Sequence, residues 1–163
     1  MAIRLIVKDP DPVLREKTVA VRNFNANLHK LLDDMAETMY DAEGVGLAAP
    51  QVGILKRVIV MDCGEEHGGL IELVNPEIVE TSGEQLGPEG CLSIPNLRGD
   101  VLRPMNVTVK GQNRFGEPIE IKGTELLARC IMHEVDHLNG VLFTDLAQTV
   151  YRVEEDGSGV KAE

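Results

Sequence analysis

The segment His133-Glu134-Val135-Asp136-His137 places two histidines one helical turn apart, with a carboxylate directly after the first. Residues four positions apart lie on one face of a helix, so His133 and His137 can bind one divalent metal ion together. Glu134 is then placed to move protons, as in hydrolysis by a metal-bound water. The same pattern also arises by chance on ordinary surface helices, so the interpretation depends on a third ligand.

The residues after His137 restrict where that ligand can come from. In metzincins the motif continues to a glycine and then to a third histidine. The chain follows this pattern as far as Gly140, but Phe143 stands at the histidine position, which excludes that class. A downstream carboxylate, as in other zinc peptidases, would come from Asp145, Glu154 or Glu155.

Cys91 is an upstream alternative. It lies in the run Gly87-Pro88-Glu89-Gly90-Cys91-Leu92-Ser93-Ile94-Pro95, whose glycines and prolines predict a rigid, exposed turn. A thiol in such a turn can bind a metal ion. The alternative is a small buried apolar residue, which is the commonest fate of a single cysteine.

Composition limits the class of protein. The chain has 163 residues, 43% of them hydrophobic, which is enough for one core. We expect one domain over residues 1–150 and a short acidic, flexible tail over 151–163. The net charge of -11 argues against nucleic acid and anionic membrane as partners. No segment is typical of a signal peptide, and three cysteines suit reduced thiols, so we expect a cytoplasmic protein.

Apolar periodicity predicts two helices around a set of short strands. One helix spans residues 25–41, with Asn25 as N-cap and with Met35 and Met39 as packing residues. The second follows Thr124 as N-cap, ends near Gly140 and carries the histidine motif. Between them, β-rich runs predict antiparallel strands at 57–61, 70–75, 78–80, 101–102, 107–110 and 119–122. We therefore predict an α+β fold with antiparallel sheets packed around a central metal-binding helix.

Three segments together resemble the peptide deformylase family, whose members remove the formyl group from the N-terminal methionine of new bacterial polypeptides. They are Gly44-Val45-Gly46-Leu47-Ala48-Ala49-Pro50-Gln51, Glu89-Gly90-Cys91-Leu92-Ser93 and His133-Glu134-Val135-Asp136-His137-Leu138. Their order and spacing are similar to those of the family, and the resemblance extends from about residue 5 to residue 146. It implies the family's α+β fold, which agrees with the pattern of elements.

The resemblance also implies roles for individual residues. Cys91, His133 and His137 match the family's metal ligands, and a bound water completes the site. Glu134 matches the general base that takes the proton of this water and delivers it to the leaving amine. One divalent metal ion is implied, with Fe(2+) as the native metal and Zn(2+) or Ni(2+) as alternatives that a Cys-His-His set also binds.

Further positions match residues that contact the substrate. Gln51 and the backbone N–H of Leu92 match donors to the oxygen on which negative charge develops. Gly46 matches a residue that hydrogen-bonds the peptide. Leu126 and Cys130 share a helix face with His133, as a slot for a methionine side chain requires, and Val45 and Glu89 complete the wall by resemblance. Asp136 is expected to pair with Arg103 and brace the helix.

The implied partners are nascent N-formylmethionyl polypeptides, with transient association with the ribosome and no direct contact with nucleic acid or membrane. Two other interpretations remain. One is a closed structural zinc site in which Cys130 supplies a fourth ligand and Glu134 has no role. The other is a general metallopeptidase that cleaves internal peptide bonds.

Overall fold

The structure is a computed structural model that describes residues 2–153 and 159–161. Its helices are α1 (Ala26–Asp41), α2 (Glu125–Leu138) and α3 (Phe143–Leu146), together with the 3₁₀ turns η1 (Pro12–Arg15), η2 (Ala49–Val52) and η3 (Glu65–His67). Its strands are β1 (Gly46–Ala48), β2 (Val58–Asp62), β3 (Leu70–Ser82), β4 (Gln85–Cys91), β5 (Ile94–Arg103), β6 (Asn106–Gln112), β7 (Pro118–Thr124), β8 (Thr149–Val153) and β9 (Gly159–Lys161).

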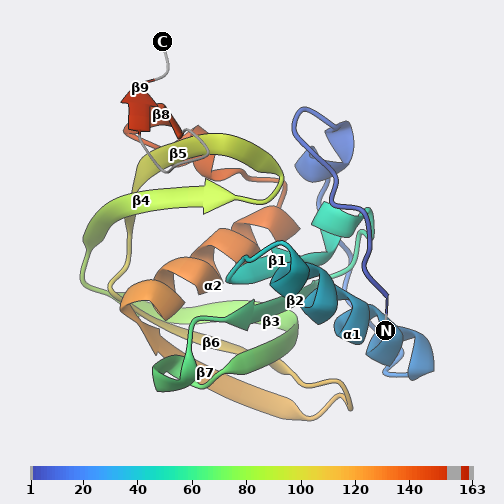
Figure 1. Cartoon of the computed structure of the whole chain (residues 1–163). Helices are drawn as coiled ribbons and strands as arrows, with labels where there is room; N and C mark the ends of the chain where they lie inside the picture. The colour runs from blue at the N-terminus through green and yellow to red at the C-terminus, as the bar shows by residue number, and fades with distance from the viewer. Residues whose placement is uncertain (1, 154–158, 162–163) are drawn as a thin grey trace.

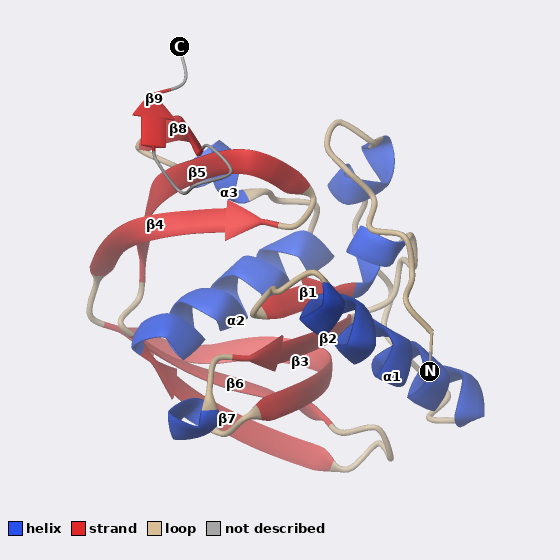
Figure 2. Ribbon diagram, in the orientation of Figure 1, coloured by secondary structure: helices blue, strands red, loops and turns tan. Residues whose placement is uncertain are grey.

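Two antiparallel sheets lie on either side of α2. The strand order is β1-β2-β3-β6-β7 in one sheet and β4-β5-β8-β9 in the other. In Figure 1, α2 runs through the middle of the molecule, with the β4–β5 hairpin on one side and the larger sheet on the other. Helix α1 packs beside β1 and β2, and the apolar side chains of these three elements form one buried cluster. Figure 2 shows the same layers by secondary structure, and the predicted α+β fold is confirmed.

Helix α1 begins where the sequence predicts. The Asn25 side chain accepts a hydrogen bond of 3.2 Å from the Leu28 N–H, which satisfies one of the donors that the first helical turn leaves unpaired. Met35 and Met39 are fully buried against β1 and β2, so their predicted packing role is confirmed.

Helix α2 begins after Thr124, also as predicted, but the threonine does not cap it through its side chain. The Thr124 hydroxyl instead donates to Asn106 Oδ1 at 3.1 Å, which ties the start of the helix to β6. Gly140 follows the helix with φ +76°, a conformation that glycine adopts without strain. Most of α2 is buried, because it faces both sheets.

The strands differ from the prediction in several places, since β1, β8 and β9 were not predicted and β5 is longer than the run 101–102. The runs 70–75 and 78–80 are one strand, β3, whose pairing with β6 shifts between Val74 and Glu77. The turn predicted around Cys91 is shorter than expected and is not exposed throughout: β4 reaches Cys91, Leu92 and Ser93 form the turn to β5, and Ser93 is fully buried. Glycine and proline tolerate these extended positions because β4 lies at the edge of its sheet.

The expected domain end at residue 150 falls inside β8. This strand pairs with β5 from Thr149 to Arg152, and β9 pairs with β8, so residues 151–153 and 159–161 are not a free tail. Residues 151 and 152 pair on both sides, with β5 and β9, and β9 pairs on one side, as the edge strand of its sheet. Residues 154–158 and 162–163 of the predicted tail lie outside the described residues. Within the described part of the chain, no helix is long and apolar enough to cross a membrane.

Candidate active site

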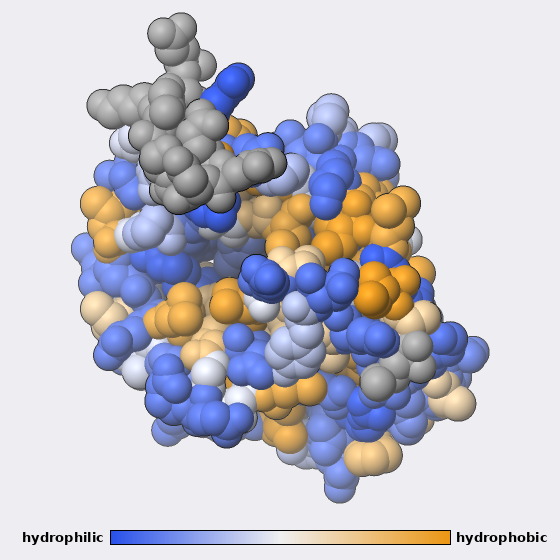
Figure 3. All heavy atoms as spheres, in the orientation of Figure 1, coloured by the Kyte–Doolittle hydropathy of each residue, from blue (hydrophilic) through white to orange (hydrophobic). Residues whose placement is uncertain are grey.

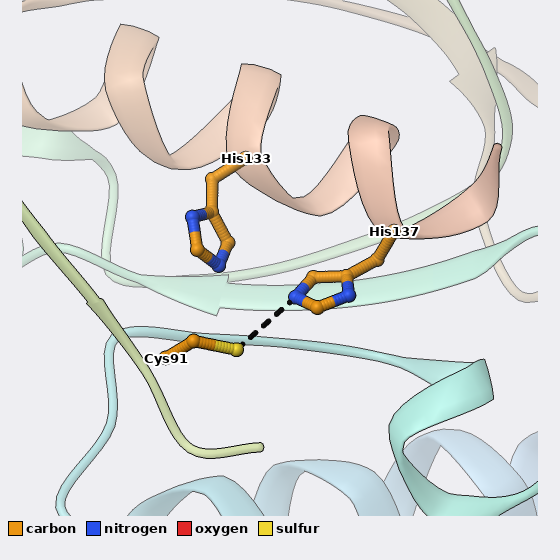
Figure 4. A group of neighbouring side chains, drawn as sticks. All are labelled: Cys91, His133 and His137. Atoms are coloured by element: carbon orange, nitrogen blue, oxygen red, sulfur yellow. Dashed lines mark hydrogen bonds between the residues drawn. The ribbon is translucent and has the colours of Figure 1, made fainter. Parts of the chain in front are cut away.

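Cys91, His133 and His137 meet between the hairpin and α2. Their ligand atoms all lie within 4.8 Å of one another, and Cys91 Sγ lies 3.3 Å from His137 Nε2. Figure 4 shows the two imidazoles side by side on α2, with the thiol pointing toward them from the end of β4. The helix supplies two ligands at a fixed spacing, and the hairpin brings the third.

The donors at this position fit a divalent metal ion. A thiol and two imidazoles form a mixed sulfur and nitrogen ligand set that zinc and ferrous iron accept. Both histidines are buried, and His137 Nδ1 has no hydrogen-bond partner among the described residues. Burial lowers the pKa of His137 well below its usual range, and a neutral imidazole is the form that binds metal.

Asp145, one of the predicted carboxylate alternatives for the third ligand, does not reach this position. Asp145 forms an ion pair with Arg15 and accepts a 3.0 Å hydrogen bond from the Leu142 N–H. Glu154 and Glu155 lie outside the described residues. The thiol of Cys91 is therefore the third donor that the described chain supplies.

Glu89 orients the imidazole of His133 through the ring nitrogen that does not face Cys91. Its Oε1 accepts a 2.8 Å hydrogen bond from His133 Nδ1, which leaves Nε2 facing Cys91 and His137. Burial acts to raise the pKa of Glu89, but hydrogen bonds from Arg103 and His133 outweigh it and lower the pKa to about 2. A charged carboxylate behind a ligand histidine fixes its tautomer and ring orientation.

Arg103 connects this carboxylate to Asp136, which lies one turn further along the same face of α2. It donates to Glu89 through Nε at 2.7 Å and through a terminal nitrogen at 2.9 Å, and to Asp136 at 2.7 Å. The structure therefore contains the expected pair of Asp136 and Arg103. Because Arg103 belongs to β5, the bridge fixes the hairpin against the helix.

Glu134 lies at the same site with a free oxygen. The residue is 4% exposed, and its Oε1 has no hydrogen-bond partner among the described residues. Burial raises the pKa of Glu134 to about 7. Its Oε2 faces Gly46, where an added Cβ would lie 2.4 Å from that oxygen, so only glycine leaves room for the carboxylate.

Gln51 and Leu92 border Cys91. The Gln51 side chain is buried, and its Nε2 donates to Ser93 Oγ at 3.1 Å and to Cys91 Sγ at 3.5 Å. Its Oε1 accepts from the Ala48 N–H at 3.0 Å, which fixes the orientation of the amide. Leu92 follows Cys91 in the hairpin turn, so its backbone lies next to the ligand cluster.

A cleft of about 500 Å³ is lined by Cys91, His133 and Glu134, together with Gln51 and Leu92. Figure 3 shows this face of the molecule hollowed between the hairpin and β1, with apolar atoms close to the opening. Val45 and Leu126 stand at the rim, since each is nearly half exposed. The other expected substrate-contacting residues that line the cleft are Gly46, Glu89 and Cys130.

Cys130 is not among the clustered ligand atoms. Its thiol points to the Val45 carbonyl oxygen at 3.5 Å, and the cluster contains Cys91, His133 and His137 alone within the described residues. This geometry does not support the closed zinc site in which Cys130 supplies the fourth ligand.

Comparison with known proteins decides the family. The model of the polypeptide deformylase family matches residues 3–153. The chain belongs to this family. It is 62% identical over 145 residues to a peptide deformylase of Alkaliphilus metalliredigens, covering 89% of this chain and 97% of that one. A peptide deformylase of Acetivibrio thermocellus is 54% identical, covering 96% of this chain and 89% of that one.

Solved structures of peptide deformylases share the fold. The crystal structure of the Thermotoga maritima deformylase matches with a TM-score of 0.87 at 43% identity, covering 91% of this chain and 99% of that one. The Legionella pneumophila deformylase gives 0.86 at 49% identity, covering 90% and 87%. The chain is accordingly a metal-dependent deformylase, an enzyme that removes the N-formyl group.

Two contributors to the site of this deformylase could not be assigned from the sequence. Ser93, fully buried, accepts the hydrogen bond that orients Gln51. Arg129, on α2, donates to Glu89 at 2.7 Å and lines the cleft. The signal available for Arg129 is its position four residues before His133, which places it on the same face of the second helix. Ser93 has no signal of this kind, because its partner is distant in the sequence.

Proposed function

We propose that this deformylase acts on the N-terminal formylmethionine of newly made polypeptides and releases formate. The observation that carries the proposal is the cleft, whose lining combines Cys91 and His133 of the ligand cluster with Glu134 and with the half-exposed side chains of Val45 and Leu126. A peptide that enters with its formyl group at the ligand cluster would place its first side chain beside Leu126.

Glu134 is proposed as the group that moves the proton. When bound by Cys91, His133 and His137, a divalent cation polarises a carbonyl and lowers the pKa of a bound water to about 7. Glu134 accepts the proton of the attacking water at its unpaired Oε1 and gives it to the departing amine. The surrounding burial keeps bulk water from competing for this oxygen.

Gln51 and Leu92 are proposed to stabilise the charge that develops on the formyl oxygen. Gln51 Nε2 lies 3.5 Å from Cys91 Sγ, so the amide faces the place where the formyl group must sit. The Leu92 N–H follows the same cysteine in the chain. Preorganised donors of this kind contribute about 3 to 4 kcal/mol each to the transition state.

Fe(2+) is proposed as the native metal, with Zn(2+) or Ni(2+) as functional substitutes. The mixed thiol and imidazole ligand set supports this group of metals but does not distinguish among its members. Iron analysis of protein purified without oxygen tests the choice. Iron that is lost together with activity during storage in air supports Fe(2+), because ferrous iron and thiolates oxidise. Activity and iron content that both survive such storage contradict it.

Nascent polypeptides in the cytoplasm are the proposed partners, with transient ribosome association. The acidic chain, with a net charge of -11, supports a substrate-mediated encounter rather than direct binding to nucleic acid. Cosedimentation with ribosomes that carry a formylated nascent chain, compared with empty ribosomes, tests this. Equal binding to empty ribosomes contradicts it.

The test of the reaction is formate release from formyl-Met-Ala-Ser. The same peptide with a free or acetylated amine should release nothing, and its internal peptide bonds should stay intact. Glu134→Ala should lower kcat by a factor of about 10² to 10⁴ while the metal content stays near that of the wild type. Exposed Glu77 supplies the control variant Glu77→Ala. Cleavage of internal bonds would identify a general metallopeptidase instead.

A further inference from the structure

Arg129 is a buried charge that the proposed mechanism does not use. It lies on the side of α2 that faces the cleft, between Leu126 and His133, and its side chain is only 9% exposed. Burying a guanidinium group is costly unless it is paired and hydrogen-bonded. Its partners therefore indicate what holds it in this position.

Three hydrogen bonds fix the guanidinium against the hairpin. One terminal nitrogen donates to Glu89 Oε2 at 2.7 Å and to the Val101 carbonyl oxygen at 3.0 Å. The other donates to the Gln85 carbonyl oxygen at 3.3 Å. These acceptors belong to β4 and β5, so the planar group is held by both strands and cannot swing as an exposed arginine does.

The guanidinium takes the place of a side chain from β4. Gly87 pairs with Val101 in the hairpin, and a Cβ added at Gly87 would lie 3.2 Å from a terminal nitrogen of Arg129. The strand therefore leaves room for the guanidinium where a larger side chain would otherwise project. The planar guanidinium group of Arg129, rather than a flexible hydrocarbon side chain, therefore borders this part of the cleft.

We propose that Arg129 is a specificity-determining residue that closes the slot for the first side chain of the substrate. The inference rests on the proposed function, because the slot is defined by a formyl group held at the ligand cluster. An unbranched apolar side chain of methionine length can enter past Val45 and Leu126 and end against the guanidinium. A longer chain meets a group held by three hydrogen bonds and is rejected.

The wild-type enzyme provides the first test. Formyl-norleucyl-Ala-Ser and formyl-2-aminooctanoyl-Ala-Ser differ by two methylene groups in the first side chain. Because a mismatched methylene changes kcat/KM by a factor of about 10 to 200 in a closed pocket, the longer substrate should be worse by at least about tenfold. Values of kcat/KM within twofold of each other would show an open slot and overturn the proposal.

Variants then assign the effect to Arg129. In Arg129→Leu the ratio of kcat/KM for the longer substrate to that for norleucine should rise by about tenfold. Arg129→Lys keeps a positive charge beside Glu89 but lacks the planar guanidinium group, so the same ratio should rise by about threefold. This variant keeps the proposal testable if Arg129→Leu fails to fold. The control is Arg114→Leu, because Arg114 is a partly buried arginine paired with Glu72 and Asp33 away from the cleft.

The ratio separates specificity from general damage. A purely structural role of Arg129 would lower kcat/KM for both substrates together and leave the ratio as in the wild type, which would overturn the inference. A ratio that rises equally in Arg114→Leu would also overturn it. Wild-type protein that releases no formate from either substrate would overturn the proposed function and this inference with it, and is distinguished by the absence of activity before any substitution.

Discussion

Glu89 Oε1 accepts a 2.8 Å hydrogen bond from the nitrogen of His133 that faces away from Cys91. The same carboxylate is held by Arg103 and Arg129, so the orientation of one ligand depends on a buried network that spans the hairpin and α2. The orientation of His133 therefore depends on the packing of the hairpin against α2.

Glu89→Gln should weaken metal binding by a factor of about 10 to 100, because an amide orients the imidazole less firmly than a carboxylate does. The measurement is metal retention against a competing chelator, with circular dichroism to establish that the variant is folded. Glu72→Gln is a matched control, since Glu72 also pairs with an arginine but away from the cleft. Metal affinity equal to that of the wild type would contradict the role of Glu89.

Gly46→Ala should lower kcat/KM by about 100-fold, because the new methyl group would lie 2.4 Å from Glu134 Oε2 and 2.8 Å from Cys130 Sγ. A shift of about 1 Å at a reacting group costs this much. Gly44→Ala is the control in the same loop, since the three heavy atoms nearest to its methyl group all belong to the Leu92 side chain, which can rotate away, and not to Glu134. Similar losses in the two variants, measured by formate release, would contradict the assignment.

Cys130→Ala should retain its metal, because the Cys130 thiol points to the Val45 carbonyl oxygen and lies outside the ligand cluster. The expected metal content per chain equals that of the wild type, determined by elemental analysis after dialysis. The cost of the change should be a loss of packing, about 1 kcal/mol of unfolding free energy. Metal loss in this variant, without loss of fold, would contradict this expectation and support a closed structural zinc site with Cys130 as the fourth ligand.

Asp34 should contribute stability that depends on pH. Burial acts to raise its pKa, but the Ala2 N–H at 2.8 Å and the side chains of Lys30 and Arg4 outweigh burial and hold the pKa below its ordinary value of 3.8. A lowered folded-state pKa means that the stabilisation is complete above the ordinary value and is lost as the pH falls through the folded-state value.

Asp34→Asn should therefore lower the unfolding free energy by about 1 to 3 kcal/mol at pH 7, and the difference from the wild type should shrink as the pH falls below about 4. Urea unfolding between pH 7 and pH 2 measures it. The exposed Asp41 at the end of the same helix gives the control Asp41→Asn. A difference that stays constant over this range would show that the charge of Asp34 has no part in stability.

The helices could be predicted from the sequence because their signals are local. Asn25 caps α1 and the apolar period of 3.6 marks its buried face, so the start of the helix and its packing residues were correct. Strand β4 was missed, because Gly87, Pro88 and Gly90 are typical of a turn and only pairing with β5 holds them extended. The fixed spacing of His133 and His137 likewise needed no tertiary information.

The remainder of the site depends on contacts between distant segments. Spacing alone left the third ligand open, because Cys91 reaches His137 only after the hairpin packs on α2. The family resemblance selected it, and the structure brings the thiol to the imidazoles. The partners of Arg129 lie on β4 and β5, so the sequence shows only that it shares a helix face with His133 and does not show its buried hydrogen bonds.

The most direct test compares bound metal in the wild type with that in Cys91→Ala. Both proteins are loaded with one equivalent of zinc, dialysed, and analysed for metal per chain. A site made by one thiol and two imidazoles predicts about one metal ion per wild-type chain and almost none in Cys91→Ala while the fold remains intact. Full metal content in the folded Cys91→Ala variant would show that the cysteine is not a ligand and would contradict the assigned metal centre.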